Sequence, residues 1–186
     1  AMAQDVPGIV RYARVHPGYG GAVISHPGAG DSRTFTEEQV LLVDTTFSSM
    51  FDYSLVKGDR WRVLRQPQTM LVSESMARKY FGEEEPVGKT LNVTGSWVNG
   101  AYTVTGVFED VPSTSHLQFD FLFPMEDLLR HPLYQSPGIG WSLNTFNTYA
   151  ELRAGADVSA IAQKVQHVEL KYQGEGYEES KTELTV

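Results

Sequence analysis

The chain has 186 residues, of which 41% are hydrophobic and 20% charged, and a formal net charge of −8. This balance is typical of a globular protein large enough for one domain or two small lobes. The acidic charge argues against a nucleic-acid-binding surface and a polybasic membrane-binding patch. The absence of cysteine from the sequence excludes thiol catalysis, cysteine-ligated zinc and disulfide bonds.

Strand-like runs alternate with glycine and proline turns in the first part of the sequence. Short apolar and period-two runs predict strands over Ile9–His16, Ala22–His26 and Val40–Val43. Asp44 then suits the N-cap of a short helix over Thr45–Phe51. We therefore expect this part to be mainly β.

Signals at both ends predict a helix over Glu74–Phe81. Ser73 is its expected N-cap, and the basic residues Arg78 and Lys79 suit its last turn. Gly82 follows where a helix commonly ends in a left-handed residue. The segment therefore has both a start signal and a stop signal for a helix.

The second half continues as a mixture of strands and helices. The predicted elements are, in order, strands over Leu91–Thr94, Tyr102–Phe108 and Gln118–Phe123, a short helix near Met125–Arg130, a loop from His131 to Gly140, and a strand over Thr145–Arg153. A final helix is capped by Asp157 or Ser159. Its apolar stripe consists of Val158, Ile161, Val165, Val168 and Tyr172. The sequence predicts an α+β fold of mixed sheets with packed helices.

One segment looks at first like a nucleotide-binding loop. Gly82, Gly88, Lys89 and Thr90 resemble the pattern G-x-x-x-x-G-K-[ST]. Five residues separate the glycines instead of four, and three of the five are glutamates that would repel phosphate. The order is also reversed, because a P-loop leaves a strand and enters a helix. We interpret the segment as a turn from a helix to a strand.

The residue types that commonly act in catalysis form no recognised catalytic motif in this sequence. The five histidines lack the spacing of a metal site. Ser113, His116 and Asp120 are close in sequence, but triads are assembled from separate segments, so a capped turn is the favoured interpretation. Glu109 and Asp110 are adjacent in a strand and would point to opposite faces. We expect no catalytic residue, no metal site and no cofactor, and hence no enzyme.

The aromatic residues of the second half allow two interpretations. The residues concerned are Phe119, Phe121, Phe123, Trp141 and Phe146. They could line a ligand-binding groove, but such a set more often forms the core between a sheet and its helices. We favour the core.

Several motifs follow one another from Val40 to Phe123, and together they support a family. They are VLLVD, FDYSLVKGD, SESMARKYFG, PVGKTL, YTVTGVFEDVP and SHLQFDF. In this order they resemble the MacB-like periplasmic core domain of ABC transporter permeases with an FtsX-like membrane part, in its Bacteroidetes-type versions. The segment 148–172 resembles the family more loosely.

The resemblance implies a domain at the periplasmic face of the bacterial inner membrane, with a porter-like β-α-β lobe and a smaller β-rich lobe. It implies that a cytoplasmic ABC ATPase hydrolyses ATP, and that the motion passes through the permease membrane helices to the periplasmic domains of a permease dimer. A periplasmic adaptor or lipoprotein is a further implied partner, and nucleic acid is not. The family has no catalytic residues to carry over.

The extent of the domain and a second function complete the expectations. We expect Ala1–Ala3 to be a cloning remnant and residues 4–186 to form a single core domain of one or two lobes. No apolar run approaches about 18 residues, so no membrane-spanning helix is expected within this sequence. An extracytoplasmic ligand-binding or sensor module stays open as the alternative function, and a deep apolar pocket would favour it.

Overall fold

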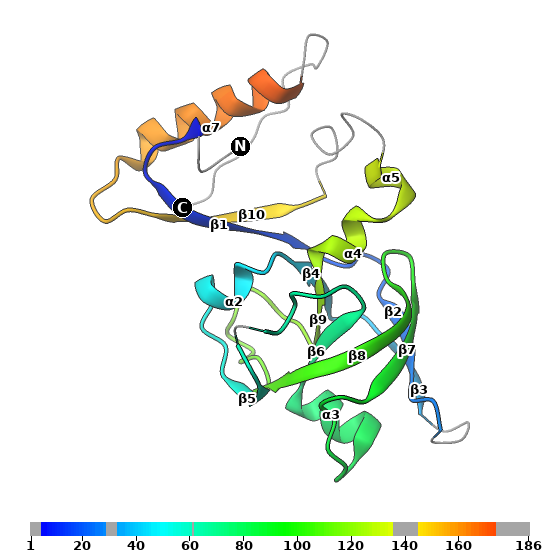
Figure 1. Ribbon diagram of the computed structural model, residues 1–186. Helices are drawn as coiled ribbons and strands as arrows, with labels where there is room; N and C mark the ends of the chain where they lie inside the picture. Colours follow the sequence, from blue (N-terminus) through cyan, green and yellow to red (C-terminus); the bar gives the residue numbers. More distant parts are fainter. Residues whose placement is uncertain (1–4, 29–32, 61, 136–144, 174–186) are drawn as a thin grey trace.

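The computed structural model describes residues 5–28, 33–60, 62–135 and 145–173. Within these ranges, one ten-stranded mixed sheet and a few short helices form a mixed α/β fold (Figure 1). The strands are β1 (Ile9–His16), β2 (Ala22–Ser25), β3 (Thr34–Glu37), β4 (Val40–Val43), β5 (Leu55–Gly58), β6 (Thr69–Ser73), β7 (Thr90–Gly95), β8 (Asn99–Phe108), β9 (Phe121–Pro124) and β10 (Asn147–Leu152). The helices are α2 (Phe47–Met50), α3 (Glu74–Phe81), α4 (Met125–Leu129), α5 (Pro132–Gln135) and α7 (Val158–Gln173).

The sheet has the strand order β10-β1-β4-β9-β6-β8-β7-β2-β3, and β5 pairs with β8 beside this path. Two neighbouring pairs, β4 with β9 and β6 with β8, are parallel, and the other pairs are antiparallel. The sheet is therefore mixed, as the sequence predicts, but it is one sheet instead of several.

The central strands are buried on both faces, which explains their uninterrupted apolar sequences. Along β4, Val40 and Leu42 belong to one hydrophobic cluster, whereas Leu41 and Val43 belong to another. In β9, Phe121 and Phe123 likewise face the first cluster while Leu122 faces the second. Successive strand residues point to opposite faces, so one run of apolar residues fills two cores.

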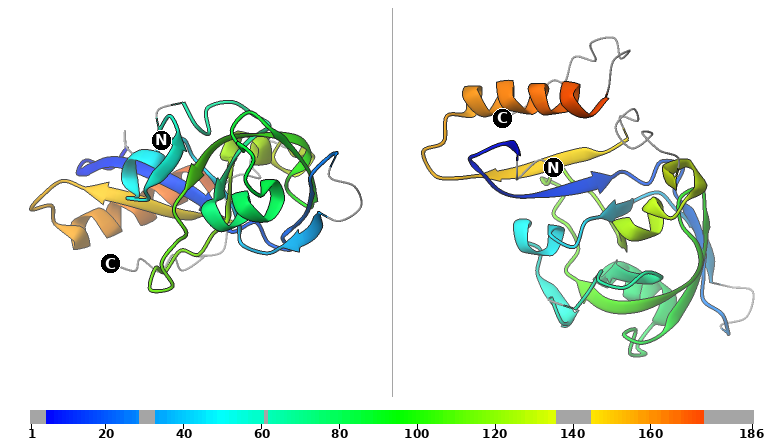
Figure 2. Two further views of the ribbon diagram at one scale, coloured as in Figure 1. Left: turned by 90° about the horizontal axis from the view of Figure 1, so that it is seen from below. Right: turned by 45° about the horizontal axis from the view of Figure 1, so that its top comes forward.

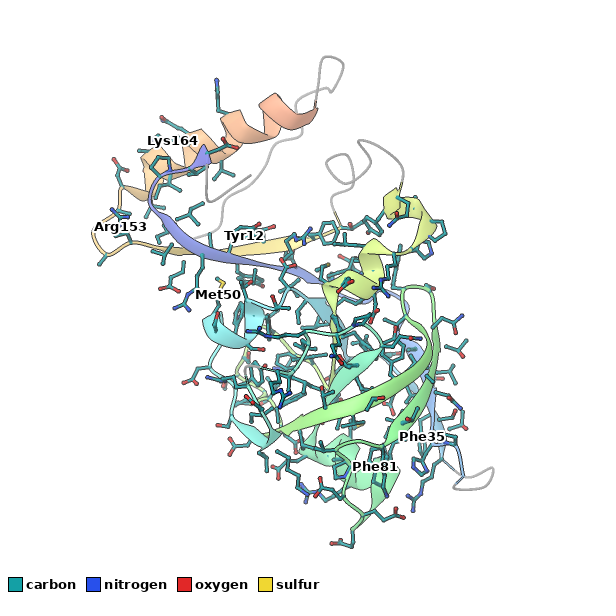
Figure 3. All side chains as sticks on the ribbon, in the orientation of Figure 1. Tyr12, Phe35, Met50, Phe81, Arg153 and Lys164 are labelled. Carbon is teal, nitrogen blue, oxygen red and sulfur yellow. The ribbon has the colours of Figure 1, made fainter. Side chains whose placement is uncertain are left out.

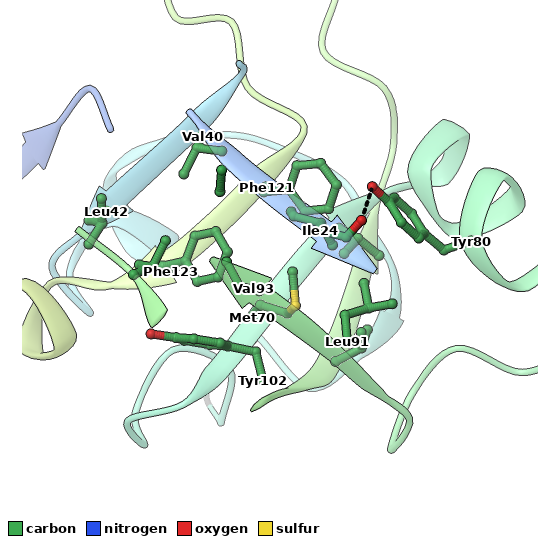
Figure 4. Packing of buried hydrophobic residues seen from close by; sticks show 14 of the residues in the cluster. Ile24, Val40, Leu42, Met70, Tyr80, Leu91, Val93, Tyr102, Phe121 and Phe123 are labelled. Atoms are coloured by element: carbon green, nitrogen blue, oxygen red, sulfur yellow. Dashed lines mark hydrogen bonds between the residues drawn. The ribbon is translucent and has the colours of Figure 1, made fainter. Parts of the chain in front are cut away.

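The first core lies where the sheet curls so that β2, β7 and β8 face β4, β6 and β9 (Figure 4). Ile24, Val93 and Tyr102 come from one side of the curl, and Met70 and Phe123 come from the other. Helices α3 and α4 contribute further buried residues to it.

The second core is an aromatic cluster beneath α2. Phe47 stacks on Phe51 with ring centroids 4.4 Å apart, and it also contacts Tyr53 and Phe119. Phe108, at the end of β8, completes the set. Met50 of α2, labelled in Figure 3, packs against this cluster from its edge.

A third, smaller core lies apart from the other two, in what we call the arm (residues 5–12 and 147–173). In both views of Figure 2, α7 runs along the ribbon of β1 and β10 and to one side of the rest of the molecule, which we call the body. Val6, Ile9, Ile161 and Val165 are buried together there. The strand β1 leaves this small core and continues into the body, where Val15 and His16 pair with β4.

The helix ends confirm most of the local predictions and correct one. The Ser73 hydroxyl accepts a hydrogen bond from Met76 N as the N-cap of α3, and Asp157 Oδ1 accepts one from Ala160 N at the start of α7. Asp44, however, is not the N-cap of the α2 helix. That helix begins at Phe47, and the Asp44 carboxylate binds Arg14 instead.

Strand boundaries differ more from the prediction. The strand predicted over Gln118–Phe123 begins at Phe121 in the structure. The helix α5 lies inside the loop that was predicted after His131. The strands β3 and β5 fall outside the predicted strands. Short strands of mixed polarity lack the periodic signal on which the prediction depends.

Candidate functional site

The quoted motifs meet at the joint between α3 and the sheet. Ser73 ends β6, and its hydroxyl both caps α3 and donates to Asp120 Oδ1 over 2.9 Å. Asp110 accepts hydrogen bonds from Ser75 N (2.9 Å) and Ser75 Oγ (2.6 Å), also in the first turn of α3. These contacts connect SESM with the EDVP and QFDF motifs. They orient the helix and leave Asp110 and Asp120 bound to serines instead of free for acid–base work.

The residues near His116 do not assemble into a triad. Asp120 is bound to Ser73, and the His116 ring faces Tyr149 with centroids 5.7 Å apart. The Gln118 side chain donates to Ser115 O over 2.8 Å and closes the turn. The arrangement is the capped turn favoured by the sequence.

The loop between α3 and β7 is bonded within the protein. Gly88 N donates to Val104 O (2.8 Å), and Lys89 N donates to Pro86 O (3.1 Å). The Lys89 ammonium forms an ion pair with Glu84. A phosphate-binding loop would aim such N–H groups and such a cation at its ligand. Here the N–H groups of Gly88 and Lys89 and the Lys89 ammonium bind other groups of the protein instead.

A buried polar contact that the sequence patterns did not reveal connects β3 to α3. Glu37 is 8% exposed, and one of its oxygens accepts from Tyr80 Oη (2.5 Å) and from Lys79 Nζ (2.7 Å). Burial, together with the neighbouring Glu37 carboxylate, raises the pKa of Tyr80. The only sequence signal was a glutamate in a short polar run, which is ordinary for an exposed strand.

The joint between arm and body lies at Arg14, two residues beyond the arm segment of β1, and at Asp44. One Asp44 oxygen accepts from Arg14 N and Nε (both 2.9 Å), and the other accepts from Nη2 (2.8 Å). These hydrogen bonds raise the pKa of the Arg14 guanidinium above its ordinary value. The Thr46 hydroxyl donates to Tyr12 O over 2.6 Å. A bidentate pair with a third hydrogen bond to the backbone fixes β1 against the start of α2.

A cavity of about 320 Å³ lies at this joint, between the strand β1 and the segment Asp44–Thr46. A larger open groove, of about 480 Å³, lies between the β7–β8 turn and α4. We call it the Asp127 groove; its walls include Gln68, Ser96, Trp97, Asn99, Tyr102 and Asp127. Both cavities carry polar side chains, so neither is the deep apolar pocket typical of an enclosed small ligand.

An aromatic cluster that includes a buried histidine adjoins the Asp127 groove. His16 is fully buried, and its Nδ1 accepts a hydrogen bond from Gly18 N over 3.1 Å. Its ring lies edge-on to Trp97 and Tyr19, with centroids 5.0 and 5.6 Å away. Burial lowers the pKa of His16 and so favours the neutral ring. The Trp97 indole N–H donates to Tyr19 O (3.1 Å), which fixes the indole ring in the wall of the groove.

The predicted aromatic set is largely core. Phe119, Phe121 and Phe123 are buried, and Phe146 is partly buried against the first cluster. Trp141 lies outside the described residues. Over the described ranges, no three His, Asp or Glu side chains gather as a metal site requires, and no helix is both long and apolar enough to cross a membrane.

Comparison with known families decides the identity of the chain. The family model described as "MacB-like periplasmic core domain" matches residues 1–168. The chain belongs to this family. No curated protein sequence matches it.

Three solved structures resemble this MacB-like domain. A domain of a putative permease from Porphyromonas gingivalis is 28% identical, with a TM-score of 0.73, and the match covers 92% of the present chain and 74% of that chain. The periplasmic region of MacB from Actinobacillus actinomycetemcomitans has a TM-score of 0.57 at 12% identity, with coverage of 87% and 66%. The extracellular domain of the transporter YknZ from Gram-positive bacteria has a TM-score of 0.62 at 13% identity, with coverage of 89% and 76%. The last two likenesses concern the fold alone.

Family membership explains why the described residues form no catalytic triad and no phosphate-binding loop. A MacB-like periplasmic core domain is a non-catalytic part of an ABC transporter permease, outside the membrane. The resemblance stated from the motifs is therefore confirmed, and the motif residues act as structural joints in the fold. The features that the motifs did not indicate are the Arg14–Asp44 joint, the Glu37 contact and the Asp127 groove.

Proposed function

We propose that this domain transmits ATP-driven conformational change in an ABC transporter permease, and that it contacts partners or substrate during export or extraction across the envelope. The observation that carries the proposal is the path of β1. Ile9 at its start is buried in the arm with α7, and its last residues, Val15 and His16, pair with β4 in the body. A force applied to either part reaches the other through hydrogen-bonded backbone.

The Arg14–Asp44 joint makes this transmission stiff. The carboxylate of Asp44 contacts both the guanidinium and the backbone of Arg14, and Asp44 N donates back to Arg14 O over 3.1 Å. Tyr149 of β10 adds an edge-to-face contact with Phe51 at 5.1 Å. With these contacts on both strands of the ribbon, arm and body are expected to move as one piece.

The lobe organisation supports the same proposal. We propose that residues 4–186 form a single core domain, in which the body is the porter-like lobe and the arm belongs to the smaller one. The porter-like assignment rests on β6 and β8, which are parallel neighbours connected through α3 and β7, a β-α-β relation with one additional strand in the crossover. The strands β4 and β9 are a second parallel pair, although several elements separate them in the sequence.

The proposed partners follow from the permease context. They are a cytoplasmic ABC ATPase acting through the permease membrane helices, a second permease copy that forms a dimer, and a periplasmic adaptor or lipoprotein. The alternative, an extracytoplasmic ligand-binding module, gains little support from two cavities that are open and partly polar.

The test uses the full-length permease with its ATPase. Spin labels at Val56→Cys, an exposed position in β5, report the distance between the two permease copies. We expect ATP to change this distance in the wild-type background. Arg14→Ala with Asp44→Ala should reduce the change while ATP hydrolysis continues. Lys57→Ala, which removes an exposed ion pair with Glu85, is the matched control and should leave the change intact.

Two results would contradict the proposal. One is a Val56 distance in the wild type that does not respond to ATP. The other is a full response in the Arg14→Ala, Asp44→Ala variant when hydrogen exchange shows that its arm has come loose from the body.

A further inference from the structure

Asp127 presents a carboxylate to the Asp127 groove, and the charge of Arg130, which forms its ion pair with Glu126, acts on it only at a distance. It lies in the first turn of α4 and is half-buried. Gln68 N approaches its two oxygens at 3.1 and 3.3 Å, and the Tyr102 hydroxyl is its other hydrogen-bond partner. Among the residues that the structure describes, no lysine or arginine forms an ion pair with it.

Two other carboxylates of the body that lose much of their solvent shell have a cation as partner, whereas the half-buried Asp120 accepts a hydrogen bond from Ser73 instead. Glu37 has Lys79 at 2.7 Å, and Asp44 has Arg14 at 2.8 Å. Burial raises the pKa of Asp127 above its ordinary value, which shows that its charge is poorly solvated. An approaching cation would therefore gain more from Asp127 than from a fully exposed carboxylate.

The backbone beside Asp127 is held in an unusual conformation. Gln68 has φ of 55°, in the left-handed region that non-glycine residues rarely adopt. Its N–H points at Asp127, and its carbonyl accepts from Thr103 N over 3.0 Å. Backbone strain of this kind clusters at ligand-binding positions because surrounding contacts must maintain it.

The walls of the groove suit a cation on an apolar stem. Trp97, which is partly exposed in the wall of the groove, supplies an aromatic ring, and such rings attract cations through their faces. Exposed Ser96 and Asn99 add hydrogen-bonding groups at the opening. Arg130 also lies at the edge, but its guanidinium is paired with Glu126 at 2.8 Å.

We propose that the Asp127 groove binds the ammonium group of a lysine side chain presented by a polypeptide partner. The Gln68 N–H and the Tyr102 hydroxyl already occupy part of the Asp127 carboxylate, which favours the single-point contact of an ammonium over the bidentate contact of a guanidinium. The open groove gives the methylene stem of lysine a place along Trp97 while the rest of the partner stays outside. The proposal stands apart from force transmission and does not depend on it.

The test is an NMR titration of the 186-residue chain with the peptide acetyl-Ala-Lys-Ala-amide, following the indole N–H signal of Trp97. We expect a saturable shift with a Kd of roughly 1 mM or tighter. Asp127→Asn should weaken binding about tenfold. Trp97→Leu lacks the indole, so its titration is followed by the backbone amide signals of Ser96 and Asn99 in the same groove, and it should weaken binding independently. Glu109→Gln removes an exposed carboxylate beyond the far end of β8 and should leave binding unchanged.

The controls separate the sources of the ammonium group. Acetyl-Ala-Ala-Ala-amide should cause no shift at Trp97, and butylamine should bind more weakly than the lysine peptide. Equal binding by butylamine would assign the site to small free amines and overturn the proposal. Unchanged affinity in both the Asp127→Asn and Trp97→Leu variants would overturn it as well, as would the absence of any saturable shift in the wild type.

Discussion

The arm should unfold separately from the body when its small hydrophobic core is destabilised, and Ile161→Ala is the substitution chosen to destabilise it. Ile161 is 6% exposed and packs with Val6, Ile9 and Val165. Its Cδ1 also sits 2.9 Å from where a Cβ on Gly8 would be, so this atom fills the space over that glycine. The change to alanine removes three carbon atoms from the centre of the smallest of the three hydrophobic clusters.

The size of the effect follows from what is removed. Three buried carbons correspond to about 2.4 kcal/mol of transfer free energy. The cavity left behind brings the cost to roughly 3 kcal/mol. A cluster with so few buried side chains has little local stability to lose, because stability is distributed unevenly over a structure. The loss should therefore release α7 and β10 from β1 while the body keeps its fold.

Hydrogen exchange measured by mass spectrometry checks this directly. Peptides from residues 147–173 should lose protection in Ile161→Ala, whereas peptides from 69–108 should keep it. Val93→Ala is the control, because Val93 is also buried but lies in the first core, and it should lower protection throughout the body. Uniform loss of protection across the whole chain in Ile161→Ala would refute the separation of arm and body.

Three further predictions concern the charged groups. A double-mutant cycle of Arg14→Ala and Asp44→Ala, measured by urea unfolding, should give a coupling free energy of about 1–3 kcal/mol. A value near zero would mean that the contact between Arg14 and Asp44 does not stabilise the fold. Lys89→Ala should change the unfolding free energy by less than about 1 kcal/mol because its partner Glu84 is exposed. Added ATP should not raise the melting temperature of the wild type or of the Lys89→Ala variant. Asp127→Asn should be more stable than wild type at neutral pH. The raised pKa means that Asp127 favours folding while protonated and loses this contribution as pH rises through the folded-state pKa, so the advantage of asparagine should vanish in acid. A constant advantage in urea titrations from pH 7 to about pH 3 would contradict this.

Local signals in the sequence predicted local structure well. The helix α3 follows from Ser73, its basic last turn and Gly82, because capping depends on residues within one turn of the helix end. The strand β9 begins three residues later than predicted and ends one residue later, because its boundaries depend on contacts that are distant in sequence. Phe119 and Phe121 share the period of a strand, but Phe119 packs in the second core and Phe121 in the first, and only the tertiary fold separates them.

The candidate site could not be predicted in the same way. Gln68, Trp97 and Asp127 come from three segments that are distant in sequence, and the curl of the sheet brings them together. Each is ordinary alone: a polar turn residue, an aromatic at a hairpin, and an acid in the first turn of a helix. The contact between Arg14 and Asp44 could not be predicted from the sequence either, because an aspartate before a helix is a normal N-cap signal.

The most direct measurement is a pair of distances in the assembled permease, with and without ATP. Spin labels at Val56→Cys and Lys164→Cys within one copy report the position of the arm relative to the body, and labels at Val56→Cys in both copies report the dimer. Since the chain has no native cysteine, the labels in this domain are specific. If the domain transmits force as one piece, the distance within a copy stays constant while the distance between copies changes with ATP. A distance between copies that ignores ATP, or a change confined to the arm, would contradict this mechanism.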